Sequence, residues 1–400
     1  MTHRSTTGEA LTFITLVGLV AYAAIATDLY LPAIPAIVTD LGATESEGQL
    51  TLSVFMVGLA IGQLIFGPLS DQFGRLPVVR IGTLLFLVTS VLCALVRQME
   101  LMWLTRTLQG IAAASGPVIA RAIVRDRYEG NRASQVMSVL SGAMAVIPMV
   151  APSLGVLILG IAPWPGVFFA LALFALLILF ALMRFPESVA RKNQERLTFR
   201  SVFGAFRAML TSTAFIGYQM AGSFSFSALF CYLSTVAYFL PDVFDVPTSL
   251  FGYAFALTVF GFMTGSLVNA SLVMRYGMNM TLRAGLLTSL ASAVGIVALA
   301  PDAKNMMSAL ALLSSTFFFG VGLTSANASM GAISLFRHQA GAASAVYGFT
   351  HALLASIVGA AAGGLYAGRL IEPALIVLAC SVLAISGLLV IPRTEVSTRS

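Results

Sequence analysis

The sequence predicts an all-α integral membrane protein with twelve transmembrane helices, arranged as two pseudo-symmetric six-helix halves. Hydrophobic residues make up 58% of the 400 residues and charged residues only 10%, against roughly 25% charged residues in soluble domains. Apolar stretches long enough to span a bilayer, about 20 residues each, recur along the chain with short polar breaks. One larger hydrophilic insert, 185–210, divides these stretches six and six.

The twelve expected spans follow one another closely. In the first half they cover residues 11–38, 48–70, 78–97, 101–123, 133–160 and 164–184. In the second half they cover residues 211–240, 249–274, 281–300, 306–330, 340–367 and 371–392. We therefore expect an N-terminal six-helix half over 1–184, a cytoplasmic central loop over 185–210 and a C-terminal six-helix half over 211–400.

The basic residues predict the orientation of the spans, because Lys and Arg in short loops stay on the cytoplasmic side. With the N-terminus in the cytoplasm, 18 of the 22 Lys and Arg residues fall in the cytoplasm. Only Arg97, Lys304 and Arg369 fall outside, and Arg106 lies within a span. Both termini are therefore expected to be cytoplasmic, and the net charge of +6 is explained by topology. A nucleic-acid partner is not expected.

Several classes of protein are disfavoured by what the sequence lacks. The three cysteines, Cys93, Cys231 and Cys380, fall in expected spans, so no disulfide framework is indicated. No Gly-rich phosphate loop followed by Lys and Ser or Thr occurs, so ATP hydrolysis of the P-loop type is not expected. The sequence has no metal-ligand cluster, and the spans offer no His and carboxylate pair for catalysis. We expect no metal, no cofactor and no enzyme activity, and no signalling domain marks a receptor.

The second and eighth spans end alike. "GPLSDQFGRLP" (67–77) aligns with "ASLVMRYGMNM" (270–280), and this alignment matches Gly74 with Gly277. The match is short, but together with the six-plus-six division it indicates two parallel halves. Such an arrangement puts a substrate site near the middle of the membrane.

Four motifs occur in order at the expected spans. "GPLSDQFGR" (67–75) resembles the cytoplasmic loop signature of the major facilitator superfamily, "RTLQG" (106–110) its Arg-x-x-Gln-Gly motif, and "APSLG" (151–155) its antiporter signature. "TDLYLPAIP" (27–35) resembles the first span of the Bcr/CflA drug:proton antiporters, a branch that includes exporters of bicyclomycin and of phenicols. The resemblance covers nearly the whole chain. It departs from the family pattern at Leu76, where another basic residue is usual, and at Ala151 and Val156, where the fuller antiporter pattern has glycines.

Asp28 is the only acidic residue that we expect within a span. A charge at that depth costs roughly 2.5–3.5 kcal/mol on insertion scales, so its side chain should face a cavity or a partner. Burial favours the neutral acid and a nearby cation favours the carboxylate, so such a group can load a proton on one side and release it on the other. The alternatives are a structural ion pair or a residue at a helix end that reaches the headgroups.

Arg106 is the only basic residue expected deep in a span, and Gln109 at i+3 shares its helical face. We expect it to be the partner of Asp28. The resemblance implies that this arginine couples protonation to the conformational change. A purely structural alternative is that Arg106 tethers its helix to neighbouring carbonyl groups.

The loop motif is expected to form a cytoplasmic latch. Gly67 permits close helix packing, and Gly74 permits a tight turn. Asp71 is expected near the start of the third helix, where the helix dipole favours a carboxylate, and it can pair with Arg75 or with Arg125. Arg80 could add the basic charge that Leu76 lacks. The family resemblance implies a cluster that forms in one conformation and breaks in the other; the alternative is a solvated turn.

The antiporter signature lies in the fifth span, with Pro148, Pro152 and Gly155. Proline removes a helical hydrogen bond, so the two prolines should bend this helix. The resemblance implies that this segment discourages leak.

The resemblance also implies that the substrate cavity is lined by the first, fourth, seventh and tenth spans. The residues expected to bind substrate combine charged, aromatic and small polar side chains; they are Asp28, Tyr30, Arg106, Gln109, Gln219, Ser223, Phe226 and Asn327. Such a cavity suits moderately sized amphipathic solutes. His351 could be a second proton site, although a packing histidine is the favoured interpretation.

Taken together, the sequence predicts a proton-coupled multidrug or antibiotic efflux antiporter that works by alternating access. Its expected partners are a small amphipathic drug-like substrate, protons and the lipid bilayer, and a monomer is expected in the bacterial inner membrane. The alternative is a proton-coupled symporter or a facilitator for a small metabolite such as an amino acid or sugar.

Overall fold

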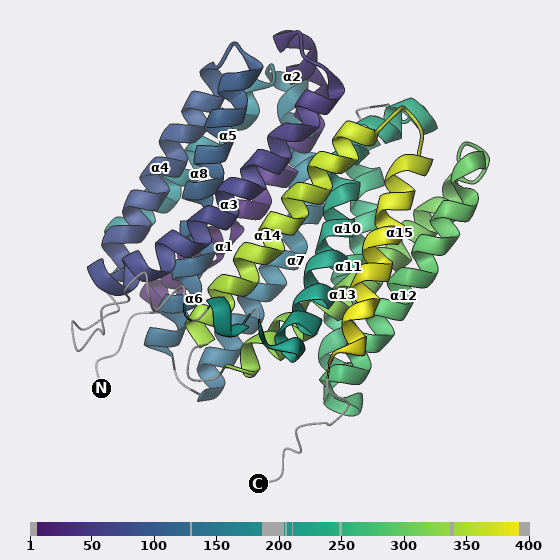
Figure 1. The fold of residues 1–400 in the computed structure, drawn as a ribbon. Helices are drawn as coiled ribbons and strands as arrows, with labels where there is room; N and C mark the ends of the chain where they lie inside the picture. The colour runs from purple at the N-terminus through teal and green to yellow at the C-terminus, as the bar shows by residue number, and fades with distance from the viewer. Residues whose placement is uncertain are drawn as a thin grey trace. The chain divides into compact units, whose positions relative to one another are not determined.

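The computed structural model describes residues 6–128, 130–185, 204, 206–209, 211–247, 250–336 and 340–391. It divides into two compact units, Met1–Leu197 and Thr198–Ser400, and each is a bundle of long helices (Figure 1). The division falls inside the expected central loop. Most of that loop, 186–203, lies outside the described residues, so the loop boundaries stay a prediction.

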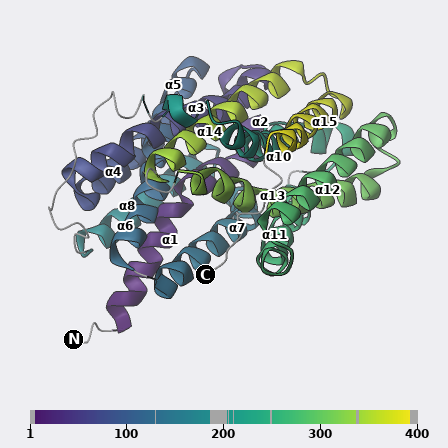
Figure 2. The same cartoon turned by 60° about the horizontal axis from the view of Figure 1, so that its bottom comes forward.

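The N-terminal unit contains eight α-helices among its described residues and one short 3₁₀ helix. They are α1 (Thr6–Asp28), η1 (Leu31–Ala33), α2 (Ile34–Leu41), α3 (Glu45–Phe73), α4 (Arg75–Leu95), α5 (Met99–Ala113), α6 (Ser115–Arg127), α7 (Gly130–Ile161) and α8 (Pro165–Met183). Within this unit α3 packs along α5, α4 along α8, and α1 along α6 and α7. Figure 2 shows the helices of this unit from below.

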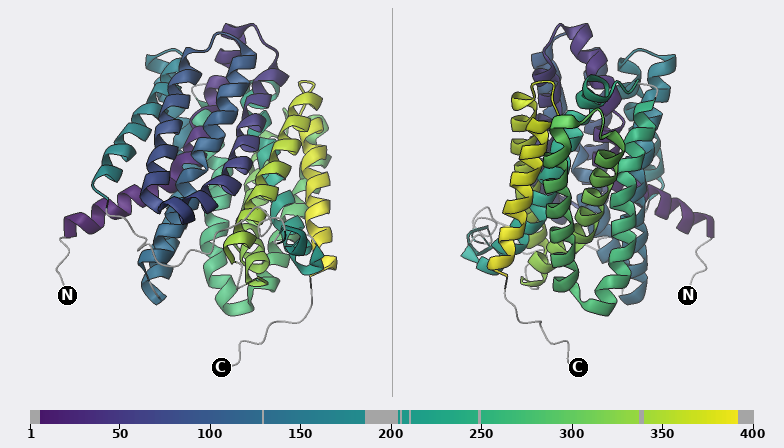
Figure 3. Two further views of the ribbon diagram at one scale, coloured as in Figure 1. Left: turned by 60° about the vertical axis from the view of Figure 1, so that its left-hand side comes forward. Right: turned by 90° about the vertical axis from the view of Figure 1, so that its right-hand side faces the viewer.

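The C-terminal unit repeats the helical plan with six long helices in its described part. They are α10 (Thr213–Phe244), α11 (Phe251–Tyr276), α12 (Met278–Leu299), α13 (Met307–Ser334), α14 (Ala340–Leu365) and α15 (Ile371–Ser386), with η3 (Ala300–Asp302) and η5 (Gly387–Leu389) as short 3₁₀ helices. Here α13 packs against α11 and α12, and α10 packs against α14 and α15. Figure 3 shows the two units from two further sides.

Eleven helical segments among the described residues are long and apolar enough to cross a membrane. They correspond to eleven of the twelve expected spans. The remaining span, 133–160, falls on α7, which is one helix from Gly130 to Ile161. Within α7, the apolar helical segment Val150–Ile161 is shorter than a membrane span. Since α7 passes through both prolines as one assigned helix, the expected bend there stays a prediction.

The first span is broken near its middle, which the sequence analysis did not anticipate. α1 ends at Asp28, and η1 and α2 continue from Leu31 to Leu41. Pro32 explains the break, because proline has no N–H to donate to the carbonyl group four residues earlier, and that carbonyl belongs to Asp28. Pro35 stands within the first two positions of α2, where a proline is tolerated. The acidic residue therefore lies at the end of a helix.

Within each unit, two helices cross at the same kind of close backbone contact. A Cβ atom on Gly62 of α3 would lie 2.4 Å from the carbonyl oxygen of Ile111, and a Cβ atom on Gly265 of α11 would lie 2.2 Å from that of Phe319. Both glycines let a second helix approach backbone to backbone. They also correspond in the same register that aligns Gly74 with Gly277, so the two units repeat one packing arrangement.

The turn that follows α3 is also repeated after α11. Gly74 has φ 96° and ψ 154°, and Gly277 has φ 80° and ψ 163°. This region of backbone space is essentially restricted to glycine. The short sequence match between the second and eighth spans thus corresponds to one backbone turn that occurs in both units.

Candidate functional site

Arg106 is the centre of a buried polar network in the N-terminal unit. Its side chain is fully buried on α5, and its Nη1 donates to the carbonyl oxygen of Ala26 on α1 at 3.2 Å and to Oε1 of Gln109 at 2.7 Å. Gln109 in turn donates from Nε2 to Oγ of Ser90 on α4 at 2.8 Å. The expected shared face of Arg106 and Gln109 is therefore present, and the network links α1, α4 and α5.

Aromatic rings surround the guanidinium group of Arg106. Its central carbon lies 4.4 Å from the ring centre of Tyr30, 4.5 Å from that of Phe55 and 6.0 Å from that of Phe168. Cation–π attraction is strongest where the cation is desolvated, as it is here. Nε and Nη2 of Arg106 are buried and have no hydrogen-bond partner among the described residues. Two nitrogen atoms with three N–H donors are therefore available to an acceptor that enters this site.

Gly110, the last residue of the "RTLQG" motif, explains how Phe55 reaches the arginine. A Cβ atom on Gly110 would lie 2.1 Å from the carbonyl oxygen of Phe55. α3 and α5 therefore meet at their backbones one turn from Arg106. Tyr30 is held on the same site because its hydroxyl group and Oγ1 of Thr51 lie 2.7 Å apart.

Asp28 is buried, with 3% of its surface exposed. Its carboxylate accepts a hydrogen bond from Oγ1 of the adjacent Thr27 at 3.2 Å. No described cationic side chain forms an ion pair with it within 4.0 Å. The expected ion pair between Asp28 and Arg106 is therefore wrong for this conformation: aromatic rings flank the guanidinium, and Arg106 contacts α1 through the carbonyl group of Ala26 instead.

The antiporter signature packs against the break in the first span. A Cβ atom on Gly155 of α7 would lie 2.3 Å from the carbonyl oxygen of Leu29 and 2.8 Å from Cγ of Pro32. Pro152 is buried on the same helix. The side chain of Pro148 lies outside the described residues. The segment thus contacts the residue next to Asp28, so a movement of α7 would act directly on the carboxylate's neighbour.

The loop motif forms a charge cluster centred on Arg75. This arginine, with 6% of its side chain exposed, pairs with Asp71 and lies with its Nε 2.8 Å from Oδ2 of Asp126 on α6. Its Nη1 also donates to Oγ of Ser70 at 2.8 Å. Sequence reasoning missed Asp126, and its position one residue before the end of a basic helix was the available signal. The cluster joins the end of α3 and the start of α4 to α6.

Two expectations about this cluster are corrected. Asp71 lies in the last turn of α3, not at the start of the next helix. The dipole at the N-terminus of α4 therefore does not stabilise the charge of Asp71, and the ion pair with Arg75 does. Arg80 does not join the cluster, because its Nε and Nη2 donate to the carbonyl oxygen of Leu182 at the end of α8, at 3.2 and 2.7 Å. The side chain of Arg125 lies outside the described residues. Gly67 is described on α3, with only Val118 near a Cβ placed there, at 4.0 Å.

In the C-terminal unit, three of the expected substrate residues lie on one face of α10. Gln219 donates from Nε2 to Oγ of Ser223 and to the carbonyl oxygen of Tyr347 on α14, at 2.5 and 3.3 Å. Phe226 stacks on His351 of α14, with ring centres 4.3 Å apart. These side chains form one cluster at the contact between α10 and α14.

Asn327 has different partners from this cluster. Its Nδ2 donates to Oδ1 of Asn269 on α11 and to the carbonyl oxygen of Leu323, both at 2.7 Å. The structure therefore pairs Asn327 with α11 and not with Gln219, Ser223 or Phe226.

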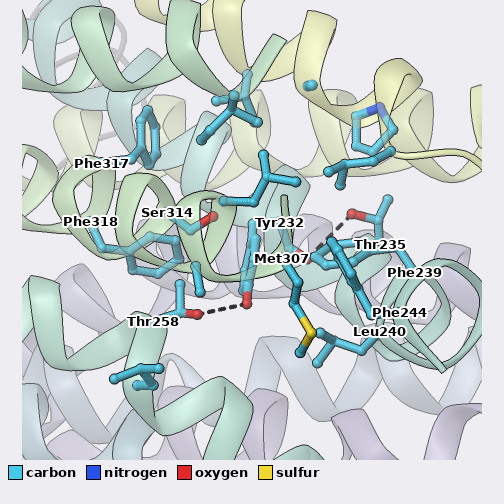
Figure 4. Close-up of a pocket in the computed structure, with 18 residues that line it drawn as sticks. Tyr232, Thr235, Phe239, Leu240, Phe244, Thr258, Met307, Ser314, Phe317 and Phe318 are labelled. Atoms are coloured by element: carbon cyan, nitrogen blue, oxygen red, sulfur yellow. Dashed lines mark hydrogen bonds between the residues drawn. The ribbon is translucent and has the colours of Figure 1, made fainter. Parts of the chain in front are cut away.

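A separate cavity of about 180 Å³ lies between α10, α11, α12, α13 and α15 (Figure 4). Its lining is mostly aromatic and aliphatic. The hydroxyl group of Tyr232 donates to Oγ1 of Thr258 at 3.1 Å, and Oγ1 of Thr235 donates to the carbonyl oxygen of Cys231 at 2.9 Å. These polar groups are satisfied by the protein itself, and none of the expected substrate residues lines the cavity.

Long apolar helices in two repeated units, with a fully buried arginine and a buried carboxyl group among them, define a multi-pass membrane transporter. The Major Facilitator Superfamily family model matches residues 15–360, and the chain belongs to this superfamily. It is therefore not an enzyme.

Named relatives lie at about 30% identity. The chain is 31% identical over 366 residues to "Uncharacterized MFS-type transporter YdgK" of Bacillus subtilis, covering 90% of each chain. It is 28% identical over 336 residues to "Bicyclomycin resistance protein homolog" of Haemophilus influenzae, covering 83% of each. It is 30% identical over 373 residues to "Multidrug resistance protein MdtL" of Escherichia coli, covering 90% of each. The resemblance to the Bcr/CflA drug-resistance group is confirmed.

Solved structures confirm the fold. The D-xylose-proton symporter matches with a TM-score of 0.75 at 16% identity, over 96% of this chain and 98% of that one. The human organic anion transporter MFSD10 matches with a TM-score of 0.71 at 18% identity, over 97% of this chain and 100% of that one. The predicted all-helical major facilitator fold is therefore correct.

Proposed function

We propose that this protein is a proton-coupled exporter of small amphipathic drug-like molecules, which exchanges protons for solute by alternating access. The observation that carries the proposal is Asp28, a buried carboxyl group at the break of the first span that forms no ion pair with a cationic side chain of the described residues. The names of the relatives from Haemophilus influenzae and Escherichia coli support a drug-like substrate.

Asp28 is suited to carry the exchanged proton. A charged carboxylate is costly at membrane depth and more so without a cationic partner, so binding a proton stabilises the conformation described here. Release of that proton then requires a change around Asp28. The contact of Gly155 with Leu29 supplies a mechanical connection, since α7 lies against the residue next to the carboxyl group.

Arg106 is proposed to couple the two events. Nε and Nη2, two buried nitrogens without partners among the described residues, offer hydrogen bonds to a solute or to a carboxylate that reaches them in another conformation. Protons that enter from outside neutralise Asp28, displace the solute outward and leave to the cytoplasm as the empty carrier returns. Each inward charge yields about 2.3 kcal/mol per 100 mV of membrane potential.

Substrate contacts are proposed for Tyr30, Arg106 and Gln109 in the N-terminal unit and for Gln219, Ser223 and Phe226 in the C-terminal unit. Asp28 contributes through its proton. Asn327 is retained as a weaker candidate because Asn269 and Leu323 already occupy its amide nitrogen.

The decisive experiment measures proton release from the purified protein in weakly buffered detergent solution on addition of a phenicol antibiotic. We expect the native chain to release protons on binding and Asp28→Asn to bind without release. Asp302→Asn is a matched control, because it removes an exposed carboxylate and should release protons as the native chain does.

Binding without release by the native chain, or release that Asp28→Asn leaves unchanged, would overturn the antiport proposal. Either result would favour the facilitator or symporter alternative. In a symporter, protonation of Asp28 and solute binding cooperate, so the protein would take up protons when solute binds.

We further propose that both termini are cytoplasmic and that the protein is a monomer in the bacterial inner membrane. The loop distribution of Lys and Arg supports this orientation. Reporter fusions at Ser400 and in the loop at Lys304 test it: a cytoplasmic reporter should be active at the first site and inactive at the second. The reverse pattern would overturn the orientation.

A further inference from the structure

Four rings form a row at the contact between α10 and α14 in the C-terminal unit. Tyr347 lies 5.5 Å from His351 at an interplanar angle of 26°, His351 lies 4.3 Å from Phe226 at 25°, and Phe226 lies 6.3 Å from Phe230 at 25°. The two helices run side by side in Figure 1 and pack along each other. Successive rings are thus inclined by only 25–26° to each other, and stacked aromatic pairs are among the arrangements that stabilise a ring contact.

Three buried polar atoms in this cluster have no hydrogen-bond partner in the part of the chain that the structure describes. They are Oε1 of Gln219, the hydroxyl group of Tyr347 and Nδ1 of His351. Gln219 is 5% exposed and Tyr347 is 7% exposed, so both side chains are more than nine-tenths buried. Buried polar atoms in folded proteins are nearly always paired, and three exceptions in one cluster indicate a place that a ligand completes.

The backbone of α10 is adapted to this hydroxyl group. A Cβ atom on Gly222 would lie 1.9 Å from the hydroxyl oxygen of Tyr347. Any other residue at position 222 would push the Tyr347 ring away from α10. In the sequence, Gln219 precedes this glycine and Ser223 follows it. The unpaired hydroxyl group is therefore held against α10 by packing at Gly222.

The partners of this cluster carry no fixed charge in the described part of the chain. Gln219, Phe226, Tyr347 and His351 contact the Ser223 hydroxyl group, a backbone carbonyl group and aromatic rings. The cluster therefore offers stacking and neutral hydrogen bonds, and it gives no compensation to an ionic group.

We propose that this cluster binds a flat, uncharged aromatic moiety of the transported solute, one that carries both a hydrogen-bond donor and an acceptor. The ring stacks on Phe226, the donor pairs with Oε1 of Gln219, and the acceptor receives a hydrogen bond from the hydroxyl group of Tyr347. This inference rests on the proposed transport function and adds Tyr347 and His351 to the residues that select the substrate.

The test uses two probes with the same polar groups, 4-hydroxybenzamide and its saturated analogue trans-4-hydroxycyclohexanecarboxamide. Their binding to the purified full chain in detergent is measured by ligand-observed NMR titration. We expect the aromatic probe to bind at least about tenfold more tightly, and Phe226→Leu to abolish that preference.

Tyr347→Phe removes only the unpaired hydroxyl group. It should weaken binding of the aromatic probe by about tenfold, the effect of one lost hydrogen bond to a buried group, while the melting temperature stays the same or rises. Tyr232→Phe is the matched control on α10, since the hydroxyl group of Tyr232 is already paired with Thr258. It should leave probe binding unchanged.

Equal binding of the two probes, or unchanged binding in Tyr347→Phe, would overturn the inference. This outcome is separable from failure of the proposed function, because the titration needs neither protons nor transport. If the phenicol-induced proton release depends on Asp28 while the probes do not discriminate, the exporter proposal stands and this cluster is only packing. If the probes discriminate but no proton is released, the site stands and antiport fails.

Discussion

Gly155→Ala tests whether α7 controls the break in the first span. The added methyl group would lie 2.3 Å from the carbonyl oxygen of Leu29 and 2.8 Å from Pro32. The nearest atom belongs to the backbone and cannot rotate away, so α7 must separate from α1. Overpacking of this kind costs about 1–3 kcal/mol. We expect a lower melting temperature and a reduced rate of proton-coupled transport, because the residue next to Asp28 shifts.

The control lies five residues further along the same helix. Gly160 has no atom within 4 Å of an added Cβ, so Gly160→Ala should be neutral or stabilising by up to about 1 kcal/mol, the usual helix preference for alanine. A thiol-reactive fluorophore can monitor unfolding, because Cys93, Cys231 and Cys380 are all buried. Equal melting temperatures for the two variants would refute the argument that Gly155 is required for close approach.

Three further changes are expected to separate packing from function. Gly74→Ala should destabilise the protein by about 1–3 kcal/mol, because φ 96° with ψ 154° is strained for any side chain; an unchanged melting temperature would contradict this. Asp126→Asn removes one of the two carboxylates that pair with the buried Arg75. It should lower transport at low salt more than Asp302→Asn does, and drug accumulation in cells measures this difference. Equal accumulation in the two variants would argue against a latch. Ala311→Leu fills part of the 180 Å³ cavity and should raise the melting temperature without changing phenicol-induced proton release, whereas loss of that release would give the cavity a role in transport.

The positions of the spans could be predicted because hydropathy is a local property of about 20 consecutive residues. The motifs around Arg106 and Arg75 could also be found locally, since their residues are close in the chain. The break at Asp28 was missed although its cause, Pro32, stands in the sequence. A proline near a span's middle leaves open whether the helix bends or ends, and only the hydrogen bonds that follow decide.

The partners of the charged residues could not be predicted from spacing. Asp126 lies 51 residues from Arg75, and Phe55 lies 51 residues before Arg106, so nothing local marks either contact. The expected ion pair of Asp28 with Arg106 matched two lone charges within one unit, but the guanidinium group lies against the rings of Tyr30 and Phe55 instead.

By itself, the sequence determined that this chain spans the membrane many times, that its halves are repeated, and that one acidic residue and one arginine within the spans stand out. These properties follow from composition, period and motif, which need no knowledge of contacts. The tertiary structure decided which atoms meet: Arg106 with aromatic rings, Arg75 with Asp126, Gly155 with Leu29, and the ring of His351 with Phe226. Such pairings depend on how helices distant in the sequence cross, and helix crossing is set by the close packing of whole surfaces.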